Sequence, residues 1–373
     1  METDHNSLKE KLRVFLNNNF DLNKRIKSFK KRKIYSLEIE LTDACNLSCI
    51  YCYATKHKKT LFLDFNKAKD LIIEAKKYGI KKIVWLGGEP TLNPRWEKII
   101  RYSKEQGISN ELWSNGTTLL ENAQEVKGSC DEFVLHLDSI NYNVFNSIQE
   151  NYLSSEIHNK ILQGLDHLIS IGFPKEKIRI NIVLSKRILP ALEDTMRYFY
   201  PTRANSFTLI PLFTTGKGAE IHKNLFLNSN DLKKAFKLRA NIEDRPERLL
   251  TGTAEYDKWY QITTVYIDSK GDVFPYAGIN LKVGNIYDSS LNRILDAHFH
   301  FLTFSDYING KIKGKCGECK NLEFCFGTRA NSFFTSRVFS ESDKTCWLDK
   351  SDFSLKNKEP EEILRILGKK EKK

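Results

Sequence analysis

Three cysteines near the N-terminal end of the chain have the spacing of a metal centre. Cys45, Cys49 and Cys52 are separated by three and then two residues, directly after an alternating apolar run, residues 37–41. Clustered thiolates are soft ligands that select zinc, copper(I) or iron–sulfur clusters. Three cysteines are one short of a closed tetrahedral zinc site. A cubane cluster held by three cysteines leaves one iron open for a further ligand, and this spacing favours such a centre over three buried apolar cysteines.

The residues around these cysteines resemble a known signature. Residues 42–53 read T-D-A-C-N-L-S-C-I-Y-C-Y, which is similar to the C-x-x-x-C-x-x-C motif of radical S-adenosylmethionine (SAM) enzymes, with an aromatic residue, Tyr51, before the last cysteine. The resemblance implies a [4Fe–4S] cluster whose open iron binds the amino and carboxylate groups of SAM. It also implies that an electron donor such as flavodoxin or ferredoxin reduces the cluster. SAM is then cleaved to methionine and a 5′-deoxyadenosyl radical, which abstracts hydrogen from a substrate.

Two further motifs stand where predicted strands end. Gly87-Gly88-Glu89 follows the second strand, and glycines allow the backbone to approach a ligand closely. Alone, this would be an ordinary turn between a strand and a helix. About forty residues after the cysteines, it resembles the family's G-G-E motif, which holds the SAM amino group. Ser114 and Asn115 resemble the T-N-G element near the SAM ribose and carboxylate, with serine in place of threonine.

Strand alternation supplies weaker candidates. His136 and Asp138 share one face of the fourth strand, and Asn181 lies on the corresponding face of the fifth. We count Asp138 and Asn181 as possible SAM contacts. His136 stands where the resemblance would place a serine, so it either contacts SAM or substrate or is satisfied by polar neighbours. Cys130 either gives a hydrogen atom to a substrate radical or is a loop cysteine without a role.

The elements that must position these residues alternate between strand and helix. Six such units in series predict parallel strands with right-handed crossovers, and hence an α/β fold. The family resemblance specifies a partial, TIM-type (β/α)6 barrel over residues 36 to about 215. The predicted strands are 36–41, 82–86, 109–113, 132–138, 178–184 and 206–213, and the predicted helices are about 65–78, 94–106, 118–126, 157–171 and 189–199.

The predicted strands have two unlike faces. In the first, fourth and fifth strands one face is apolar, which suits outer helices, and the other carries polar residues such as Glu38, Glu40 and Arg179. Because function in such barrels lies at the carboxyl ends of the strands, we expect the polar faces to line a chamber for cofactor and substrate.

A second group of cysteines lies near the C-terminal end. Its spacing, C-x2-C-x5-C followed twenty residues later by a fourth cysteine, completes a tetrahedral set, and a structural zinc site is a fair alternative. Beside the first motif, the group resembles the SPASM and twitch extensions of radical SAM enzymes, which carry auxiliary [4Fe–4S] clusters. The four residues are Cys316, Cys319, Cys325 and Cys346.

The full SPASM pattern has more cysteines than this chain. Its further positions would fall at Tyr276, near Ser289 and at Arg329, so the resemblance implies one auxiliary cluster, the outer one. Ala277 replaces the acidic residue of sulfatase-maturing relatives, which counts against that activity. We therefore expect a small α+β iron–sulfur domain, with a hairpin formed by residues 263–267 and 273–274 and a helix near 289–300.

Composition sets the remaining expectations. The 373-residue chain carries 59 basic and 47 acidic side chains, a net charge of +12, half of it within residues 1–35. The run Lys30-Lys31-Arg32-Lys33 is either a solvated face or a surface that steers an acidic partner. No apolar stretch is long enough for a membrane span, and the N-terminus has no signal-peptide character. Eight cysteines without an export signal predict a reducing cytoplasm.

We predict five segments. They are a basic helical extension at 1–34, with Leu8, Leu12, Phe15 and Leu16 on one face, the barrel at 35–215, a connecting segment at 216–258 that is helical over residues 231–239, an auxiliary-cluster domain at 259–349, and a basic tail at 350–373.

Three functions are compatible with these patterns. The first is a radical SAM enzyme that modifies a peptide, such as a ribosomally made precursor. Because residues 1–34 are too short and too helical for a complete leader-binding domain, a separate protein would then deliver the leader peptide. The second is a radical SAM dehydrogenase or epimerase of a small molecule, such as a sugar or amino-acid derivative. The third is a zinc-stabilised nucleic-acid-binding protein.

Overall fold

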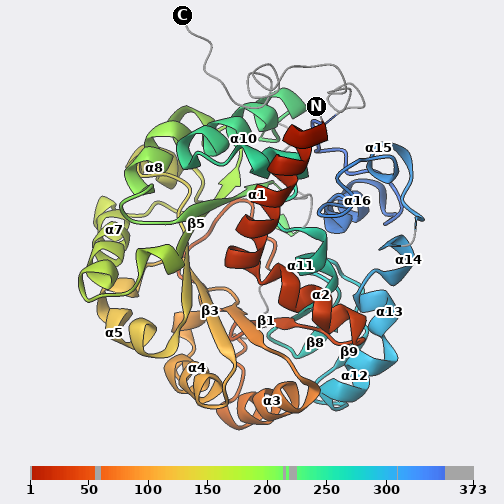
Figure 1. The fold of residues 1–373 in the computed structure, drawn as a ribbon. Coiled ribbons are helices and arrows are strands. Elements are labelled where there is room, and N and C mark those ends of the chain that lie inside the picture. The colour runs from red at the N-terminus through yellow and green to blue at the C-terminus, as the bar shows by residue number, and fades with distance from the viewer. Residues whose placement is uncertain (1, 55–59, 213–215, 218–224, 309, 349–373) are drawn as a thin grey trace, which may run out of the picture.

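The fold is a ring of strands with helices around its outside, as Figure 1 shows. This computed structural model describes residues 2–54, 60–212, 216–217, 225–308 and 310–348, with side chains from Asn6 onwards. The tail predicted at 350–373 lies outside the described residues. Strands and helices alternate through the first two thirds of the chain, so the predicted α/β fold with a partial barrel is confirmed.

The elements have the following bounds. The strands are β1 (Ser36–Glu40), β2 (Lys82–Leu86), β3 (Ser109–Ser114), β4 (Glu132–His136), β5 (Ile178–Leu184), β6 (Ser206–Pro211), β7 (Thr264–Ile267), β8 (Asp272–Phe274) and β9 (Gly284–Asn285). The helices are α1 (Glu2–Phe20), α2 (Leu22–Lys30), α3 (Phe65–Tyr78), α4 (Trp96–Glu105), α5 (Leu119–Ser129), α6 (Tyr142–Ser147), α7 (Ser155–Ser170), α8 (Leu192–Phe199), α10 (Ser229–Glu243), α11 (Lys258–Ile262), α12 (Leu291–Ala297), α13 (Phe299–Leu302), α14 (Ser305–Ile308), α15 (Gly314–Gly317) and α16 (Arg329–Ser336).

Local sequence signals set the ends of the barrel helices. Before α3, the Asp64 carboxylate accepts from the backbone N–H groups of Asn66 and Lys67, which satisfies two donors of the first turn. The helix ends at Gly79, whose φ of 104° is a conformation that glycine adopts without strain. The predicted barrel helices lie within a few residues of the observed ones. Only the short helix α6 was missed, because six residues give too little periodicity to detect.

All strands of the described chain form one sheet. Its order is β6-β5-β4-β3-β2-β1-β7-β8-β9, with parallel pairing from β6 to β7 and antiparallel pairing from β7 to β9. The predicted hairpin is confirmed, since Tyr266 pairs with Phe274. However, β7 also pairs in parallel with β1, with Ser36 opposite Thr264. The segment predicted as a separate small domain therefore begins by extending the barrel sheet.

The outer faces of the strands carry the main hydrophobic core. Leu37, Ile39, Leu135 and Ile180 are fully buried or nearly so, and they belong to one core cluster with the apolar faces of the surrounding helices. The inner faces are mostly polar, as predicted. The exception is β2, where Val84 joins a small apolar cluster inside the ring with Leu86, Tyr266 and Phe274. The interior is therefore part chamber and part packed side chains.

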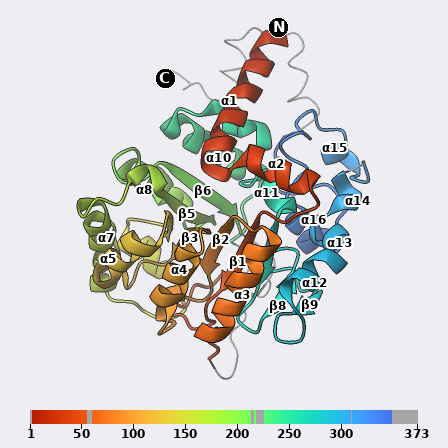
Figure 2. The same cartoon turned by 60° about the horizontal axis from the view of Figure 1, so that its bottom comes forward.

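The N-terminal extension forms two helices rather than the single one predicted. The break lies at Asp21, which adopts a left-handed conformation with φ of 57°. Figure 2 shows α1 and α2 above the strands, and in Figure 1 the same two helices cross in front of the ring. The predicted apolar face of α1 packs on residues of the C-terminal half, among them Leu250, Tyr256 and Phe324. The extension thus closes the amino end of the barrel.

Helix α10 belongs to the barrel wall. It begins after Asn228, whose side chain accepts from the N–H of Asp231, and it packs against α8 and β6. Residues 216–258 were expected to connect two domains, with a helix over 231–239. The observed helix is longer. It covers β6, the strand at the edge of the parallel part of the sheet, and this contact buries the apolar side of α10.

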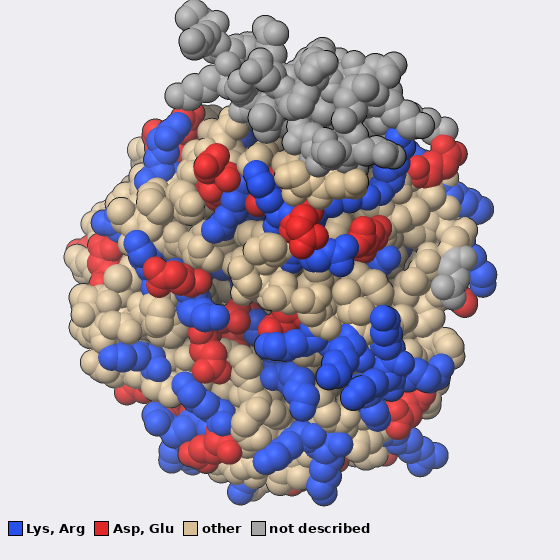
Figure 3. Space-filling view, viewed as in Figure 1, with Lys and Arg blue, Asp and Glu red and all other residues tan. Residues whose placement is uncertain are grey.

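Basic side chains gather on one face. Figure 3 shows Lys and Arg over the lower right of the view, where Figure 1 places the end of α2 beside α3 and α12. Two members of the basic run pack on aromatic rings. The guanidinium of Arg32 lies 5.1 Å from the Phe299 ring centre, and the Lys33 ammonium 4.0 Å from that of Tyr78. Part of this charge therefore attaches α2 to the molecule. In the described ranges no helix has both the length and the apolar character needed to cross a membrane.

Candidate active site and metal centres

The first cysteine loop leaves β1 at the carboxyl end of the sheet and rests on the turn after β2. The N–H of Gly88 donates to the Thr42 carbonyl at 2.8 Å, and the N–H of Glu89 to the Ala44 carbonyl at 2.6 Å. A Cβ atom on Gly88 would lie 2.1 Å from the Ala44 carbonyl oxygen, and one on Gly87 would lie 2.3 Å from that of Thr42. The glycines therefore permit two chain segments to approach each other, whereas we had expected them to admit a ligand.

Amide groups from the loop itself and from two distant segments donate to its sulfurs. The N–H of Leu47 lies 3.5 Å from the Cys45 sulfur, and the Asn115 side chain reaches the same sulfur at 3.8 Å. The Gln149 side chain donates to the Cys49 sulfur at 3.5 Å. Gln149 was not predicted, because nothing in its local sequence marks it. It reaches the loop because residues 148–150 bond to the backbone of residues 48–50.

Glu89 joins the G-G-E turn to the Ser114–Asn115 turn. Its Oε1 accepts from the hydroxyls of Thr91 at 2.6 Å and Ser114 at 2.9 Å, and its Oε2 accepts from the N–H of Asn115 at 2.7 Å. The side chain is fully buried, and burial raises its pKa despite these donors. What the geometry provides is a carboxylate that positions two other predicted residues, Ser114 and Asn115.

Tyr51 connects the cysteine loop to the inner faces of β4 and β5. Its hydroxyl lies 2.9 Å from His136 Nε2 and donates to Asp138, and His136 Nδ1 lies 3.1 Å from the Asn181 side-chain nitrogen. Asp138 also accepts from the N–H of Val183 at 2.6 Å. His136 is thus satisfied by polar neighbours. The Asn181 oxygen is buried and has no partner among the described residues, so it can accept from a bound ligand.

Cys130 lies away from these groups. It immediately precedes β4, at the amino end of the sheet, and is 3% exposed within the main core. Burial raises its thiol pKa to about 12. A hydrogen-atom donor to a substrate at the carboxyl end would have to lie at the other end of the strand. Cys130 is therefore a core side chain, and its candidate role is withdrawn.

The chamber between the two ends is acidic and rich in tyrosine. Glu38 accepts from the Tyr260 hydroxyl at 3.0 Å, while Glu40 accepts from the Tyr266 hydroxyl and from the N–H of Ser269. Burial raises the pKa of both glutamates to about 7, because no basic side chain among the described residues pairs with either.

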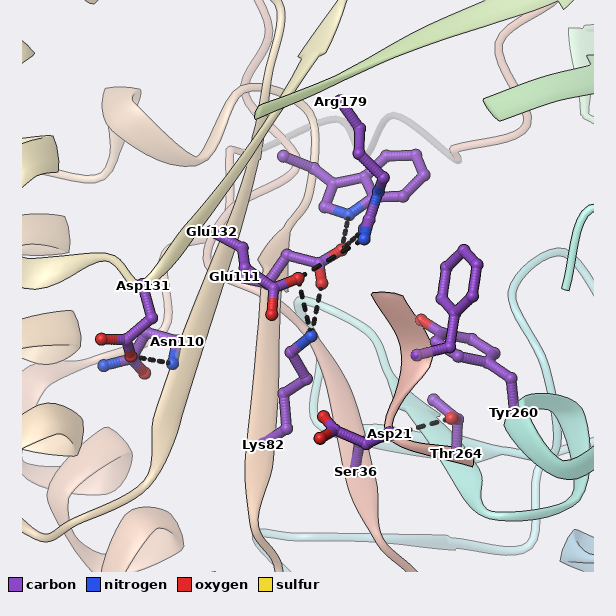
Figure 4. A network of polar contacts seen from close by, with 12 residues as sticks. Asp21, Ser36, Lys82, Asn110, Glu111, Asp131, Glu132, Arg179, Tyr260 and Thr264 are labelled. Carbon is purple, nitrogen blue, oxygen red and sulfur yellow. Dashed lines mark hydrogen bonds and ion pairs between the residues drawn. The ribbon is translucent and has the colours of Figure 1, made fainter. Parts of the chain in front are cut away.

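A network of four charges forms the floor of this chamber, as Figure 4 shows. Lys82 lies 2.9 Å from both Glu111 and Glu132, and Arg179 pairs with the same two carboxylates. Burial alone would raise the pKa of Glu111, but the charges of Arg179 and Lys82 outweigh it and hold that pKa below its ordinary value. Two positive and two negative groups balance, so the floor needs no external partner.

The N-terminal helices seal this floor from outside. Arg25 of α2 is fully buried between the rings of Tyr35 and Tyr260, at 4.7 and 4.3 Å. Its guanidinium donates to the hydroxyls of Ser36 and Thr264, which begin β1 and β7. Since these hydroxyls stand at the amino ends of the strands, α2 closes the ring opposite the cysteine loop.

The four C-terminal cysteines surround one cavity. Cys316, Cys319, Cys325 and Cys346 all line it, together with the turn at residues 250–254. Backbone N–H groups lie 3.3 to 3.5 Å from three of the sulfurs, those of Cys316, Cys319 and Cys325. Burial raises the thiol pKa of Cys346 to about 12 and also raises that of Cys325. A cationic centre would be needed to hold these groups as thiolates.

Both cysteine groups offer sulfur ligands, which suit an iron–sulfur cluster. Among the residues that the structure describes, no three Cys, His, Asp or Glu side chains are arranged to hold one metal ion. A zinc ion needs its ligands about 2.0–2.3 Å from one point, whereas a cubane spreads its cysteines over several irons. All eight cysteines lie in the described chain, and each is a free thiol rather than half of a disulfide.

Part of the chain matches a known protein family. Residues 39–199 match the family described as the Radical SAM superfamily. An AdoMet-dependent heme synthase of Methanosarcina barkeri is 24% identical over 337 residues, which cover 82% of this chain and 94% of that protein. A probable GTP 3′,8-cyclase of Sulfurisphaera tokodaii is 26% identical, over 66% of this chain and 74% of that protein.

The fold also occurs in solved structures. Streptococcus suis SuiB, bound to its precursor peptide SuiA, superposes with a TM-score of 0.67 at 17% identity, over 87% of this chain and 80% of SuiB. The enzyme anSMEcpe with bound AdoMet gives a TM-score of 0.62 at 17% identity, over 84% of this chain and 90% of that chain. At this identity the likeness concerns the fold.

Proposed function

Because the chain belongs to the radical SAM superfamily, we propose that it binds SAM at the Cys45–Cys52 loop and modifies a substrate held in the barrel chamber. The third function considered, zinc-stabilised nucleic-acid binding, loses its support, because this superfamily consists of enzymes. When bound, the cluster and SAM supply a 5′-deoxyadenosyl radical that takes hydrogen from the substrate. Such clusters are sensitive to oxygen, which is in keeping with the reducing cytoplasm predicted above.

One observation carries the proposal: three motifs far apart in the sequence meet through direct hydrogen bonds. The loop that carries Cys45 rests on the turn at Gly88, and Glu89 ties that turn to Ser114 and Asn115. Asn115 in turn reaches the Cys45 sulfur. In this arrangement Cys45, Cys49 and Cys52 hold the cluster, while Glu89 fixes the turn that would contact SAM. The unpartnered Asn181 oxygen is a further acceptor for it.

We propose one auxiliary [4Fe–4S] cluster at the second site. The support is the cavity lined by all four cysteines, with N–H donors beside three of the sulfurs. Four cysteines supply one ligand to each iron, so this cluster would have no vacancy for substrate. Two roles remain for it, bracing the surrounding segment and passing electrons. Reduction of either cluster requires a donor such as flavodoxin or ferredoxin.

We propose a peptide as the substrate. The support is that SuiB and anSMEcpe, which share the fold, are described with bound peptides. A separate leader-binding protein would deliver the peptide here, because α1 and α2 are packed into the barrel floor rather than presented as a docking domain.

A small molecule is the second candidate. The heme synthase relative aligns along nearly its whole length, 94%, whereas the peptide-modifying neighbours are related by fold alone. This comparison favours a small, functionalised substrate that the chamber carboxylates could bind. It extends our earlier alternative of a sugar or amino-acid derivative.

The test is anaerobic incubation of the reconstituted enzyme with SAM, reductant and each candidate substrate, followed by mass spectrometry. We expect 5′-deoxyadenosine in every reaction and a mass change in a peptide encoded near this gene. A mass change only in small molecules would select the second candidate. Absence of 5′-deoxyadenosine in protein that contains iron would contradict the proposed chemistry itself.

A variant of the second site tests the auxiliary cluster. If the cluster passes an electron from an oxidised substrate, then Cys346→Ser should lower product yield more than SAM cleavage, because radical formation needs only the first cluster. The comparison is valid in protein that stays folded and keeps the first cluster. An equal loss of both would assign the second site a structural role and weaken the case for an oxidative reaction.

A further inference from the structure

Arg329 is a buried cation beside the second cysteine site. It is the first residue of α16, its exposed fraction is 0%, and it stands where the full SPASM pattern would have a cysteine. Guanidinium groups remain charged in proteins, and burying a charge is costly unless a partner balances it. The groups that surround Arg329 therefore determine how its charge is balanced.

One edge of the guanidinium is occupied and the other is not. Nη1 donates to the carbonyls of Phe339 at 2.6 Å and Glu341 at 2.9 Å. Nε and Nη2 are buried and have no hydrogen-bond partner among the described residues. No carboxylate in the described chain lies within ion-pair distance of Arg329. The nearby Asp343 instead accepts from the N–H groups of Thr328 and Thr345.

The unoccupied edge is beside the sulfur of Cys316. A Cβ atom on Gly327 would lie 2.4 Å from Arg329 Nη2 and 3.0 Å from the Cys316 sulfur, so the two atoms flank one small space. Gly327, with φ of 69°, is the residue that leaves this space open. Cys316 and Gly327 both line the cavity that the four cysteines surround. Nη2 of Arg329 therefore lies beside a sulfur of the metal site.

We propose that Arg329 is the counter-charge of the four-cysteine centre. This inference rests on the proposed auxiliary cluster and adds a residue that is not a ligand. Four thiolates give such a centre net negative charge, which grows when an iron–sulfur cluster is reduced. A fixed positive charge beside one sulfur stabilises the reduced form more than the oxidised form. Hydrogen bonds to cluster sulfurs act in the same direction. Arg329 would thus raise the reduction potential of the cluster.

A purely structural role would look different, as Arg25 illustrates. That buried guanidinium is enclosed by two tyrosine rings and donates to three hydroxyls and a carbonyl, and only its Nη2 has no partner among the described residues. Arg329 has one ring, that of Phe326, at the longer distance of 5.5 Å. Asp343 lies on the same side and attracts the guanidinium, but it is not within ion-pair distance, so the thiolates of the metal centre would supply the closest negative charge. Its contribution to stability should therefore depend on whether metal is bound.

The first test measures the potential of the auxiliary cluster alone. Full-length protein with Cys45, Cys49 and Cys52 replaced by alanine retains only the second site. We compare this triple-alanine protein with three variants of it that also carry Arg329→Gln, Arg329→Lys or Arg337→Gln. The measurement is a redox titration followed by electron paramagnetic resonance. Arg337 is an exposed arginine at the end of the same helix and serves as the matched control. We expect R329Q to shift the potential downward, R329K to shift it less, and R337Q to leave it unchanged. Equal potentials in R329Q and the triple-alanine protein would overturn the proposal.

The second test compares metal-loaded with metal-free protein by denaturant unfolding. We expect R329Q to destabilise the loaded form and to leave the metal-free form as stable or more stable, because there the buried charge is uncompensated. Equal destabilisation of both forms would make Arg329 structural and overturn the proposal. Metal analysis of the triple-alanine protein tests the auxiliary cluster separately from the role of Arg329. Zinc in place of iron would refute the auxiliary cluster, and the unfolding comparison would still decide the role of Arg329 beside a zinc–thiolate centre.

Discussion

The two ends of the barrel use buried polar groups in opposite ways. At the amino end, Lys82, Glu111, Glu132 and Arg179 pair with one another, and α1 and α2 cover them. At the carboxyl end lie the three cysteines proposed as cluster ligands, and the buried Asn181 oxygen has no partner among the described residues. The same strands carry both sets. At the amino end the four charges balance one another, whereas the carboxyl end carries the residues that we propose to bind cofactors.

This difference assigns stability to one end and chemistry to the other. A closed charge network fails when one partner is removed, because the remaining charge stays buried without compensation. An open set of donors and acceptors can be altered while the fold persists. Variants at the two ends should therefore affect different measurements, and the following predictions test that separation, starting from the largest effect.

Replacing Cys45, Cys49 and Cys52 with alanine should abolish 5′-deoxyadenosine formation. We expect the iron content to fall by about half, from about eight to about four per chain, because one of two four-iron clusters is lost. The unfolding midpoint of the remaining structure should change little. The measurements are iron analysis and chromatography of SAM products. Cys130→Ala is the matched control, since that cysteine lies in the core, and it should leave both values intact. SAM cleavage by the triple variant would contradict the assignment.

Lys82→Met should lower the free energy of unfolding by about 3–5 kcal/mol, because it leaves Glu111 buried beside only one cation. Denaturant unfolding measures the loss, and SAM affinity per folded molecule should be retained. Lys104→Met removes an exposed lysine whose partner Asp131 is 3.5 Å away, and it should change stability by less than about 1 kcal/mol. If Lys82→Met lost SAM affinity but kept its stability, the amino end would contribute to chemistry rather than to stability, contrary to our assignment.

Glu89→Gln should weaken SAM binding by roughly tenfold while the cluster spectrum stays intact, because it disrupts about one hydrogen bond of the positioning set. The new amide would turn a donor toward the Asn115 N–H or the hydroxyls of Ser114 and Thr91, all of which now donate to the carboxylate. Calorimetric titration with SAM measures the change. Glu105→Gln, at the exposed end of α4, is the control. Unchanged affinity would mean that Glu89 only forms a turn.

Glu38→Gln should make stability less dependent on pH. In the folded protein burial raises the pKa of Glu38 to about 7, above the ordinary value of 4.5. Between these values the folded state holds more protons than the unfolded state, so stability falls as pH rises from about 4.5 to about 7. Glu38→Gln removes one such contribution, while Glu40 and Asp257, whose pKa values burial raises to about 7 and about 6, supply others. Unfolding midpoints across this range test the sign. If the stability of Glu38→Gln fell with rising pH as steeply as that of the parent protein, Glu38 would lie outside the low-dielectric interior.

Much of the fold and of the first site could be predicted from local patterns. Alternating strands and 3.6-residue helical periods are short-range signals, so the six barrel strands and five of their helices were predicted within a few residues. The cysteines could also be recognised, because close spacing in sequence forces closeness in space. Gly87, Gly88 and Glu89 were identified for their place at a strand end. Their actual partners, the backbone of residues 42–44, could not be inferred.

What the sequence determined by itself is therefore the set of elements and the chemistry of each cysteine group. The tertiary structure alone decided that β7 extends the barrel sheet, that Gln149 reaches the Cys49 sulfur, and that Arg329 turns a free edge toward Cys316. These contacts join residues as far apart as 228 positions, as in the hydrogen bond between Ser36 and Thr264. No local preference encodes them. They follow from the packing of complete elements against one another, where the burial of apolar faces sets the position and polar side chains must then find partners within it.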